Sequence, residues 1–200
     1  ESLDEADTLS RVAVRLGKQA RVGFRINPDV AANTHAKITT GSAHNKFGVP
    51  IADAMAAYER ARDLPGLIVQ GIAVHIGSQL MDLAPLRAAF AKIGALIGEL
   101  RAAGHSITLA DLGGGLGVPY DPAAPIPPSP ADYGAMVAEV TQGWDVRFAF
   151  EPGRLIVANA GVLGVSYAEA GPATGEPVIL LHGWPYDIHS FGEVAPLLAA

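Results

Sequence analysis

The sequence lacks cysteine and is poor in charge. The absence of cysteine from its 200 residues excludes disulfides and thiolate metal sites. Only 17% of the residues are charged, and the net charge of −6 argues against nucleic-acid binding and against a basic membrane-binding patch. No apolar run approaches the roughly 18 residues of a membrane span, and no signal peptide opens the chain. We therefore expect a cytoplasmic protein without nucleic-acid or membrane partners.

The chain also lacks an initial methionine. It begins at Glu1 and its first methionine is Met55, so we expect an internal fragment. The composition that is present is globular, with 50% apolar residues. Two hundred residues allow one or two domains and a sizeable core.

Strand and helix patterns alternate along most of the chain. Helical spacing of apolar residues predicts helices over 9–16, 52–62, 86–100 and 130–140, and the start of another over 155–160. Apolar runs predict strands over 20–26, 67–76, 107–112 and 146–150. The strand ends lie roughly 40 residues apart, a spacing typical of βα units. We predict an α/β fold, about half of a (β/α)₈ barrel, with an open doubly wound sheet as the alternative.

Two of these helices have well-defined apolar faces and ends. The first has Leu9, Val12, Ala13 and Leu16 on one face, and Gly17 ends it. The third has Leu86, Phe90, Ile93, Ile97 and Leu100 on one face, with Asp82 as a cap at its start and Gly104 at its end.

Polar residues and glycines follow three of the predicted strands. They are His75 with Ser78, then a glycine run of Gly113, Gly114 and Gly115, and finally Glu151, Pro152, Gly153 and Arg154 after a strand that we expect to be buried. The carboxyl ends of parallel strands meet at one edge of a sheet, where α/β folds place their sites. An imidazole, a glycine nest and a Glu/Arg pair suit an anionic aromatic cofactor.

Each of these groups also has a purely structural interpretation. The glycine run can form a tight turn, and His75 can be a satisfied core residue. Glu151 can be an ion-pair partner of Arg154, although we expect its strand end to be partly desolvated. A carboxylate beside a pyridine nitrogen would keep that nitrogen protonated and make the ring an electron sink. The long polar loop after the first strand contains His35, His44, Lys37 and Lys46, but no carboxylate cluster at ligand spacing, so we assign no metal site.

Several motifs occur in order along the chain: Arg25-Ile26-Asn27-Pro28-Asp29-Val30, Thr34-His35, Thr40-Gly41, Asn45-Lys46-Phe47-Gly48, His75-Ile76-Gly77-Ser78-Gln79, Asp111-Leu112-Gly113-Gly114-Gly115-Leu116-Gly117 and Glu151-Pro152-Gly153-Arg154. Together they resemble the diaminopimelate decarboxylase family, pyridoxal-phosphate enzymes with an alanine-racemase-like barrel. The resemblance covers residues 1–163 and implies that they form a partial cofactor-binding barrel domain.

The resemblance implies a lyase that releases CO₂ from meso-diaminopimelate to give L-lysine, with pyridoxal 5′-phosphate as cofactor and a homodimer as the family's assembly. By family position, His75 stacks on the pyridine ring, and Ser78 and the glycine run hold the phosphate. Glu151 faces the ring nitrogen. Gly153 and Arg154 lie at the phosphate, and Arg154 also reaches a substrate carboxylate.

The resemblance also implies parts that this sequence does not contain. The family's lysine that binds the cofactor covalently lies before the region matching residue 1, and Lys37 and Lys46 lie in the wrong motif to replace it. The family's C-terminal β-domain carries a cysteine proton donor, and this chain has no cysteine. We therefore assign no catalytic residue, and we expect that the 200 residues alone do not decarboxylate diaminopimelate.

The composition changes after Gly164, and residues 164–200 are a second predicted segment. Residues 165–200 resemble the N-terminal strand, loop and helix of an α/β-hydrolase of the haloperoxidase/dehalogenase type. The stretches that carry the resemblance are Val165-Ser166-Tyr167-Ala168-Glu169-Ala170-Gly171 and Pro177-Val178-Ile179-Leu180-Leu181-His182-Gly183-Trp184-Pro185. No Gly-x-Ser-x-Gly elbow follows them, so His182 is not assigned as a catalytic base. A hydrolase and a non-catalytic barrel fragment are the alternative functions.

Overall fold

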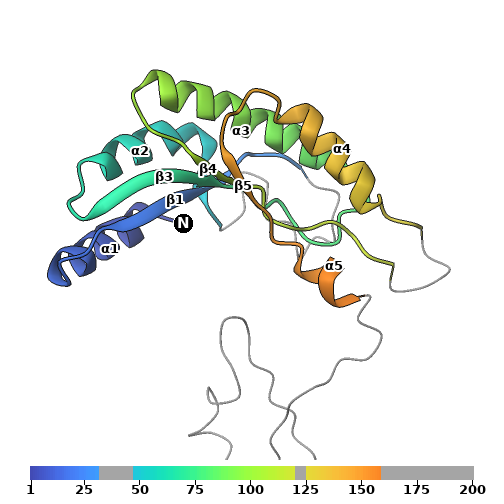
Figure 1. Ribbon diagram of the computed structural model, residues 1–200, viewed down its shortest axis with the longest axis horizontal. Coiled ribbons are helices and arrows are strands. Elements are labelled where there is room, and N and C mark those ends of the chain that lie inside the picture. The colour runs from blue at the N-terminus through green and yellow to red at the C-terminus, as the bar shows by residue number, and fades with distance from the viewer. Residues whose placement is uncertain (32–46, 120–124, 159–200) are drawn as a thin grey trace, which may run out of the picture. The chain divides into compact units, whose positions relative to one another are not determined.

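Strands and helices alternate along the computed structural model, which describes residues 1–31, 47–119 and 125–158 (Figure 1). The elements are α1 (Leu3–Arg15), β1 (Ala20–Asn27), β2 (Val49–Pro50), the 3₁₀ turn η1 (Ile51–Asp53), α2 (Ala54–Arg62), β3 (Leu67–Ala73), α3 (Ala84–Ala102), β4 (Leu109–Asp111), α4 (Pro130–Val140), β5 (Arg147–Ala149) and α5 (Gly153–Ala158). The short strand β2 was not predicted from the sequence. All the strands and helices predicted over residues 9–160 are present. The helix over 130–140 has the predicted bounds, and the others differ at one or both ends.

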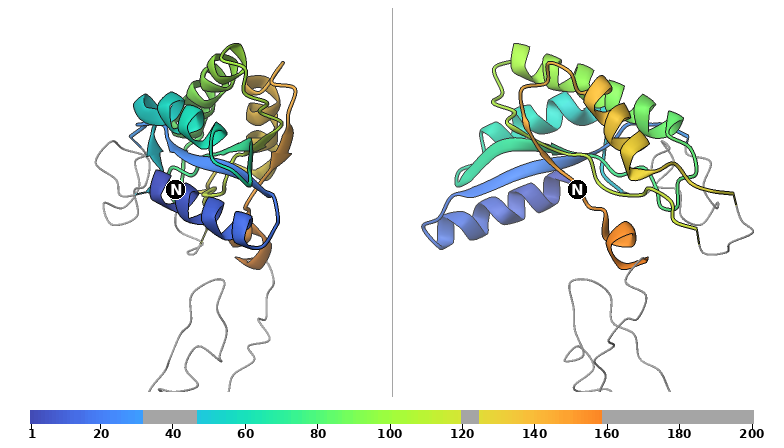
Figure 2. Two further views of the ribbon diagram at one scale, coloured as in Figure 1. Left: turned by 90° about the vertical axis from the view of Figure 1, so that its left-hand side faces the viewer. Right: turned by 45° about the vertical axis from the view of Figure 1, so that its right-hand side comes forward.

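The five strands form one parallel sheet in the order β2-β1-β3-β4-β5. Helices α1 to α4 lie around the outside of the strands, in the order in which they occur in the chain (Figure 2). A doubly wound sheet would carry helices on both faces. The arrangement is therefore that of part of a barrel, as predicted, and among the described residues the sheet remains open.

Helix α3 supplies much of the core, and its predicted face is confirmed. The five residues predicted on that face are all buried: Leu86, Phe90, Ile93, Ile97 and Leu100. Asp82 accepts a hydrogen bond from the backbone N–H of Ala84 at 2.9 Å, but the N-cap position is Leu83, one residue later than the predicted cap. Gly104 has φ +88°, the left-handed conformation that suits the residue after a helix.

The predicted face of α1 is wrong in part. Leu9 and Leu16 are exposed, at 39% and 62%, whereas Ala6, Ser10 and Ala13 are buried. The helix begins earlier than predicted because the side chain of Ser2 accepts from the N–H of Glu5 and Glu5 returns the bond, which forms a capping box. The buried stripe consists of small residues because α1 packs closely against β1 and α2.

Strand β5 is not buried, contrary to our expectation. Phe148 is 38% exposed and Phe150 is 45% exposed. Within the described sheet, β5 is an edge strand that pairs only with β4. Its rings pack on their neighbours instead, with centroids 6.0 Å apart for Trp144 and Phe148 and 6.3 Å apart for Tyr133 and Phe150. An apolar strand sequence therefore does not ensure burial at a sheet edge.

Some sequence predictions lie outside the described residues. They include His35, Lys37, His44 and Lys46 in the loop after β1, the boundary between residues 163 and 164, and the hydrolase-like segment with His182. These stay predictions. No helix in the described ranges is long and apolar enough to cross a lipid bilayer.

Candidate functional site

The ends of β3, β4 and β5 lie side by side at one edge of the sheet. The ladder continues past the strands, because the N–H of Val74 donates to the carbonyl of Asp111 at 2.9 Å and the N–H of Leu112 donates to the carbonyl of Ala149 at 3.0 Å. The three groups of predicted residues, which are up to 79 positions apart in the chain (154 − 75), therefore converge as expected. The edge is the one formed by the carboxyl ends of the strands.

His75 lies at the end of β3 and is half-buried. Its Nδ1 accepts a hydrogen bond from the N–H of Gly114 at 3.3 Å. Burial and the nearby Arg25 guanidinium lower the pKa of His75, whereas the Asp111 carboxylate opposes the shift. A neutral ring that accepts at Nδ1 carries its proton on Nε2. The imidazole is therefore a neutral, oriented ring.

The glycine run is the point where three loops meet. The N–H of Gly113 donates to Oδ1 of Asp111 at 2.9 Å, and the N–H of Glu151 donates to the carbonyl of Gly113 at 2.8 Å. A Cβ on Gly114 would collide with the carbonyl oxygen of Glu151, and a Cβ on Gly115 with that of Gly77. The tight-turn interpretation is thus correct in itself, and close packing of backbones explains why these positions are glycine.

Ser78 and Arg154 join the ends of β3 and β5. Nη2 of Arg154 donates to Oγ of Ser78 at 2.7 Å, and both side chains are half-buried. The hydroxyl hydrogen of Ser78 and the N–H groups of the guanidinium are donors that suit an anion. Two residues that the sequence placed in separate motifs therefore form one polar cluster.

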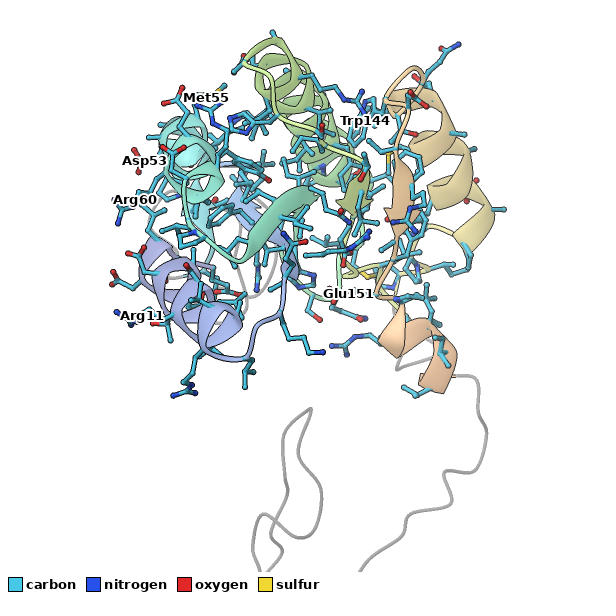
Figure 3. The ribbon with its side chains drawn as sticks, turned by 60° about the vertical axis from the view of Figure 1, so that its left-hand side comes forward. Arg11, Asp53, Met55, Arg60, Trp144 and Glu151 are labelled. Atoms are coloured by element: carbon cyan, nitrogen blue, oxygen red, sulfur yellow. The ribbon has the colours of Figure 1, made fainter. Side chains whose placement is uncertain are left out.

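Glu151 differs from our expectation. The residue is exposed, not partly desolvated, and Figure 3 shows it where β5 leads into α5. Among the ion pairs of the described residues there is none between Glu151 and Arg154, so the ion-pair interpretation is wrong for this structure. The turn is instead closed by the backbone, since the N–H of Gly153 donates to the carbonyl of Glu151 at 2.9 Å.

A cavity of about 520 Å³ adjoins the polar cluster. Its walls come from α4, β5 and the turn after β5, and they include Tyr133, Phe148 and Phe150. Burial, with a smaller contribution from the Asp111 charge, raises the pKa of Tyr133 to about 12. The glycine run, Glu151 and Arg154 also line the cavity, but His75 and Ser78 do not. We therefore place the candidate site at the polar cluster, with the cavity as its apolar neighbour.

Three residues near the cluster were quoted within sequence motifs but assigned no role. Arg25 donates from Nη2 to the carbonyl of His75 at 3.5 Å and lies 5.4 Å from the ring centre of Phe47. Asp111 accepts from the glycine run, and Gln79 bonds to the loop after β4. The sequence signal that could have identified these three residues is that each stands in one of the motifs that resemble the decarboxylase family.

The donor set at the cluster suits a phosphate group. The N–H groups of Gly113 and Gly114 already donate to Asp111 and His75. The donors that suit an anion are the Ser78 hydroxyl, the Arg154 guanidinium and the N–H of Gly115, beside Gly77. A neutral flat ring at His75 adds a surface for an aromatic group. In the described part of the chain, no group of three or more His, Asp or Glu side chains could hold a metal ion.

Comparison with known proteins gives consistent matches. The family model described as "Pyridoxal-dependent decarboxylase, pyridoxal binding domain" matches residues 1–158. The chain is 55% identical to a diaminopimelate decarboxylase of Zymomonas mobilis over 163 residues, which are 82% of this chain and 39% of that protein. It is 48% identical to the diaminopimelate decarboxylase of Pseudomonas aeruginosa over the same length, with the same two coverages.

Solved structures agree. The crystal structure of diaminopimelate decarboxylase from Helicobacter pylori complexed with L-lysine matches with a TM-score of 0.74 and 37% identity, over 78% of this chain and 39% of that chain. This chain therefore spans about two fifths of the length of the relatives that it matches.

Proposed function

The chain belongs to the pyridoxal-dependent decarboxylase family, and from that premise we propose that its polar cluster binds the phosphate of pyridoxal 5′-phosphate in an enzyme that converts meso-diaminopimelate to L-lysine. The observation that carries the proposal is the hydrogen bond between Arg154 and Ser78, at 2.7 Å. It brings a guanidinium and a hydroxyl to one point beside the glycine run. The chain spans 39% of the length of its Zymomonas mobilis relative, so we assign to it the binding of the cofactor and not the whole reaction.

The proposed residues contact two parts of the cofactor, its phosphate and its pyridine ring. Ser78, Gly115 and Arg154 would donate to the phosphate, and Gly113, Gly114 and Gly153 would form the backbone around it. A guanidinium suits a phosphate because its donors match pairs of oxygens. His75 would offer its ring as a surface for the pyridine ring, and its neutral form would avoid repulsion between the imidazole and a protonated ring nitrogen. When bound, the cofactor supplies an electron-poor ring that accepts the electron pair left when CO₂ departs.

Glu151 and Arg154 have further roles in this proposal. The Glu151 carboxylate would pair with the pyridine nitrogen of a bound cofactor and hold a proton there. Its exposure leaves that carboxylate accessible to a ligand. Arg154 also orients a substrate carboxylate. Meso-diaminopimelate is the proposed substrate on the strength of the relatives' names and the lysine bound in the Helicobacter pylori enzyme. The homodimer stays what the family resemblance implies, and the cytoplasmic location what the composition predicts.

Equilibrium dialysis of pyridoxal 5′-phosphate tests the proposal. The Arg154→Met variant should bind the cofactor at least about thirtyfold more weakly than the wild type, because loss of a charged partner costs roughly 2 kcal/mol or more. Arg147→Met is the matched control, since Arg147 is an exposed arginine on β5. It should bind as the wild type does. Equal affinities of the two variants, or no saturable binding by the wild type, would count against the proposal.

The reaction itself is checked with the same preparations. Lysine formation from meso-diaminopimelate, followed by chromatography, would support the substrate assignment. It would at the same time contradict our expectation that these 200 residues alone do not turn it over. Glu151→Gln should retain cofactor affinity, because the substitution leaves the donors to the phosphate in place.

A further inference from the structure

The loops after β3 and β4 are joined backbone to backbone. We name residues 77–81 the β3 loop and residues 113–118 the β4 loop. The N–H of Leu80 donates to the carbonyl of Gly115 at 2.8 Å, and the N–H of Gly117 donates to the carbonyl of Leu80 at 2.9 Å. Leu80 and Leu116 thereby form an isolated parallel bridge. A Cβ on Gly117 would lie 2.8 Å from the carbonyl oxygen of Leu80, so the two loops have no spare room between them.

The side chain of Gln79 extends this pairing by one step. Its Nε2 donates to the carbonyl of Val118 at 2.5 Å, and its Oε1 accepts from the N–H of Val118 at 3.2 Å. Of the standard side chains, only a primary amide offers a fixed donor and acceptor side by side as a peptide group does. The side-chain amide of Gln79 therefore makes the pair of hydrogen bonds that the backbone of a neighbouring strand residue would make.

The backbone of Gln79 is in an unusual conformation. Its φ is +59°, the left-handed region that is uncommon for a residue with a long side chain. Such conformations persist where surrounding contacts hold them, and they cluster at functional sites. The contacts that hold this one are the two bonds to Val118, together with the adjacent bridge at Leu80.

We propose that Gln79 is a positioning residue of the polar cluster. Its side-chain amide fixes the β3 loop to the β4 loop, and this directs Ser78 toward Arg154 and the glycine run. This inference rests on the proposed function. Ser78 is the residue immediately before Gln79, so its hydroxyl direction depends on the backbone of its neighbour. The Oγ–Nη2 distance of 2.7 Å between Ser78 and Arg154 is the geometry that the amide maintains.

Ligand selectivity tests the inference. Gln79→Met keeps the length and the neutral charge of the side chain but removes both bonds to Val118. We expect it to bind pyridoxal 5′-phosphate and inorganic phosphate about tenfold more weakly than the wild type, the factor for one or two lost supporting hydrogen bonds. Affinity for pyridoxal, which has no phosphate, should not change. A general loss of structure would weaken both aromatic ligands alike.

The control is Gln142→Met, in an exposed turn after α4. It should bind all three ligands as the wild type does. Wild-type affinity of the Gln79 variant for pyridoxal 5′-phosphate would overturn the inference and leave the proposed function intact. If the wild type binds neither phosphate-bearing ligand, the proposed function fails, and this inference fails with it.

A second measurement needs no variant. In NMR spectra of the wild type, the side-chain amide protons of Gln79 should exchange with solvent much more slowly than those of Gln142. Slow exchange supports the contact even if the Gln79 variant does not fold. Exchange of the Gln79 amide as fast as that of Gln142 would overturn the inference.

Discussion

The ends of β3 and β5 contribute to one candidate site but differ in their surroundings. After β3, the chain is enclosed by β1 on one side and β4 on the other, and Val74, Ile76 and Leu80 are at most 2% exposed. After β5, Glu151 and its two successors are exposed. The sequence patterns are alike, an apolar run followed by a short polar motif. The difference shows that burial at a strand end is set by the neighbouring strands, which the run itself does not specify.

The largest expected effect comes from forcing the turn after β5 away from the glycine run after β4. Gly114→Ala places a Cβ against the carbonyl oxygen of Glu151, and neither backbone can move without breaking the ladder. We expect a loss of about 4 kcal/mol or more in the free energy of unfolding, measured in urea.

The control for this substitution is Gly98→Ala. Gly98 is an exposed residue within α3, and a Cβ there meets no other atom within 4 Å. Alanine favours a helix more than glycine does, so the variant should be more stable by about 0.5–1 kcal/mol. Similar stability of the two variants would mean that the strand ends are not in tight contact.

An intermediate effect sharpens the contrast between the two strands. Ile72 in β3 is 1% exposed, whereas Phe148 in β5 is 38% exposed. Ile72→Ala should cost about 3 kcal/mol, through lost burial and the cavity left behind. Phe148→Ala removes a larger side chain but should cost only about 1 kcal/mol, because its ring packs on one side. Chemical denaturation of the two variants checks this order, and the reverse order would refute the assigned edge position of β5.

The smallest expected effect is a dependence on pH. Burial and the Arg25 guanidinium lower the pKa of His75, and burial together with the Arg62 charge lowers that of His105, against the opposing charge of Glu59. Below the ordinary histidine value of about 6.5, the unfolded chain binds protons that the folded chain resists. The free energy of unfolding should therefore fall as the pH is lowered from about 6.5.

Urea unfolding at several pH values between about 5 and 8 measures this slope. In the double variant His75→Asn/His105→Phe, the slope should be smaller. Asparagine is the substitute for His75 because its amide oxygen can still accept from the N–H of Gly114. An unchanged slope in the double variant would assign the effect to other groups.

The sequence predicted the positions of the helices and strands more reliably than it predicted which of their residues are buried. The helical face that ends at Leu100 was correct because α3 packs on the sheet with a wide apolar stripe. The face of α1 was wrong because that helix packs through small residues: Ser10 is 4% exposed, and its Oγ donates to the carbonyl of Pro65 at 2.7 Å. Such a polar contact across 55 residues has no periodic signal.

The sequence predicted which residues lie together at the strand ends but not the contacts between them. Motif order located His75, Ser78, the glycine run and Arg154 at strand ends. The bond between Ser78 and Arg154 depends on the pairing of three strands and could not be derived from either motif. The role of Gln79 could not be predicted, because it depends on hydrogen bonds to the backbone of Val118, 39 residues later in the chain.

The Arg154–Ser78 bond also has a consequence for the order of folding. The two residues are 76 positions apart, so their contact closes a long loop and carries a large entropic cost unless the intervening chain is already ordered. That chain contains α3, β4, α4 and β5. We therefore expect the contact to form late, after β5 has joined the sheet. During synthesis, a nascent chain that has not yet added β5 would lack the polar cluster of Ser78 and Arg154.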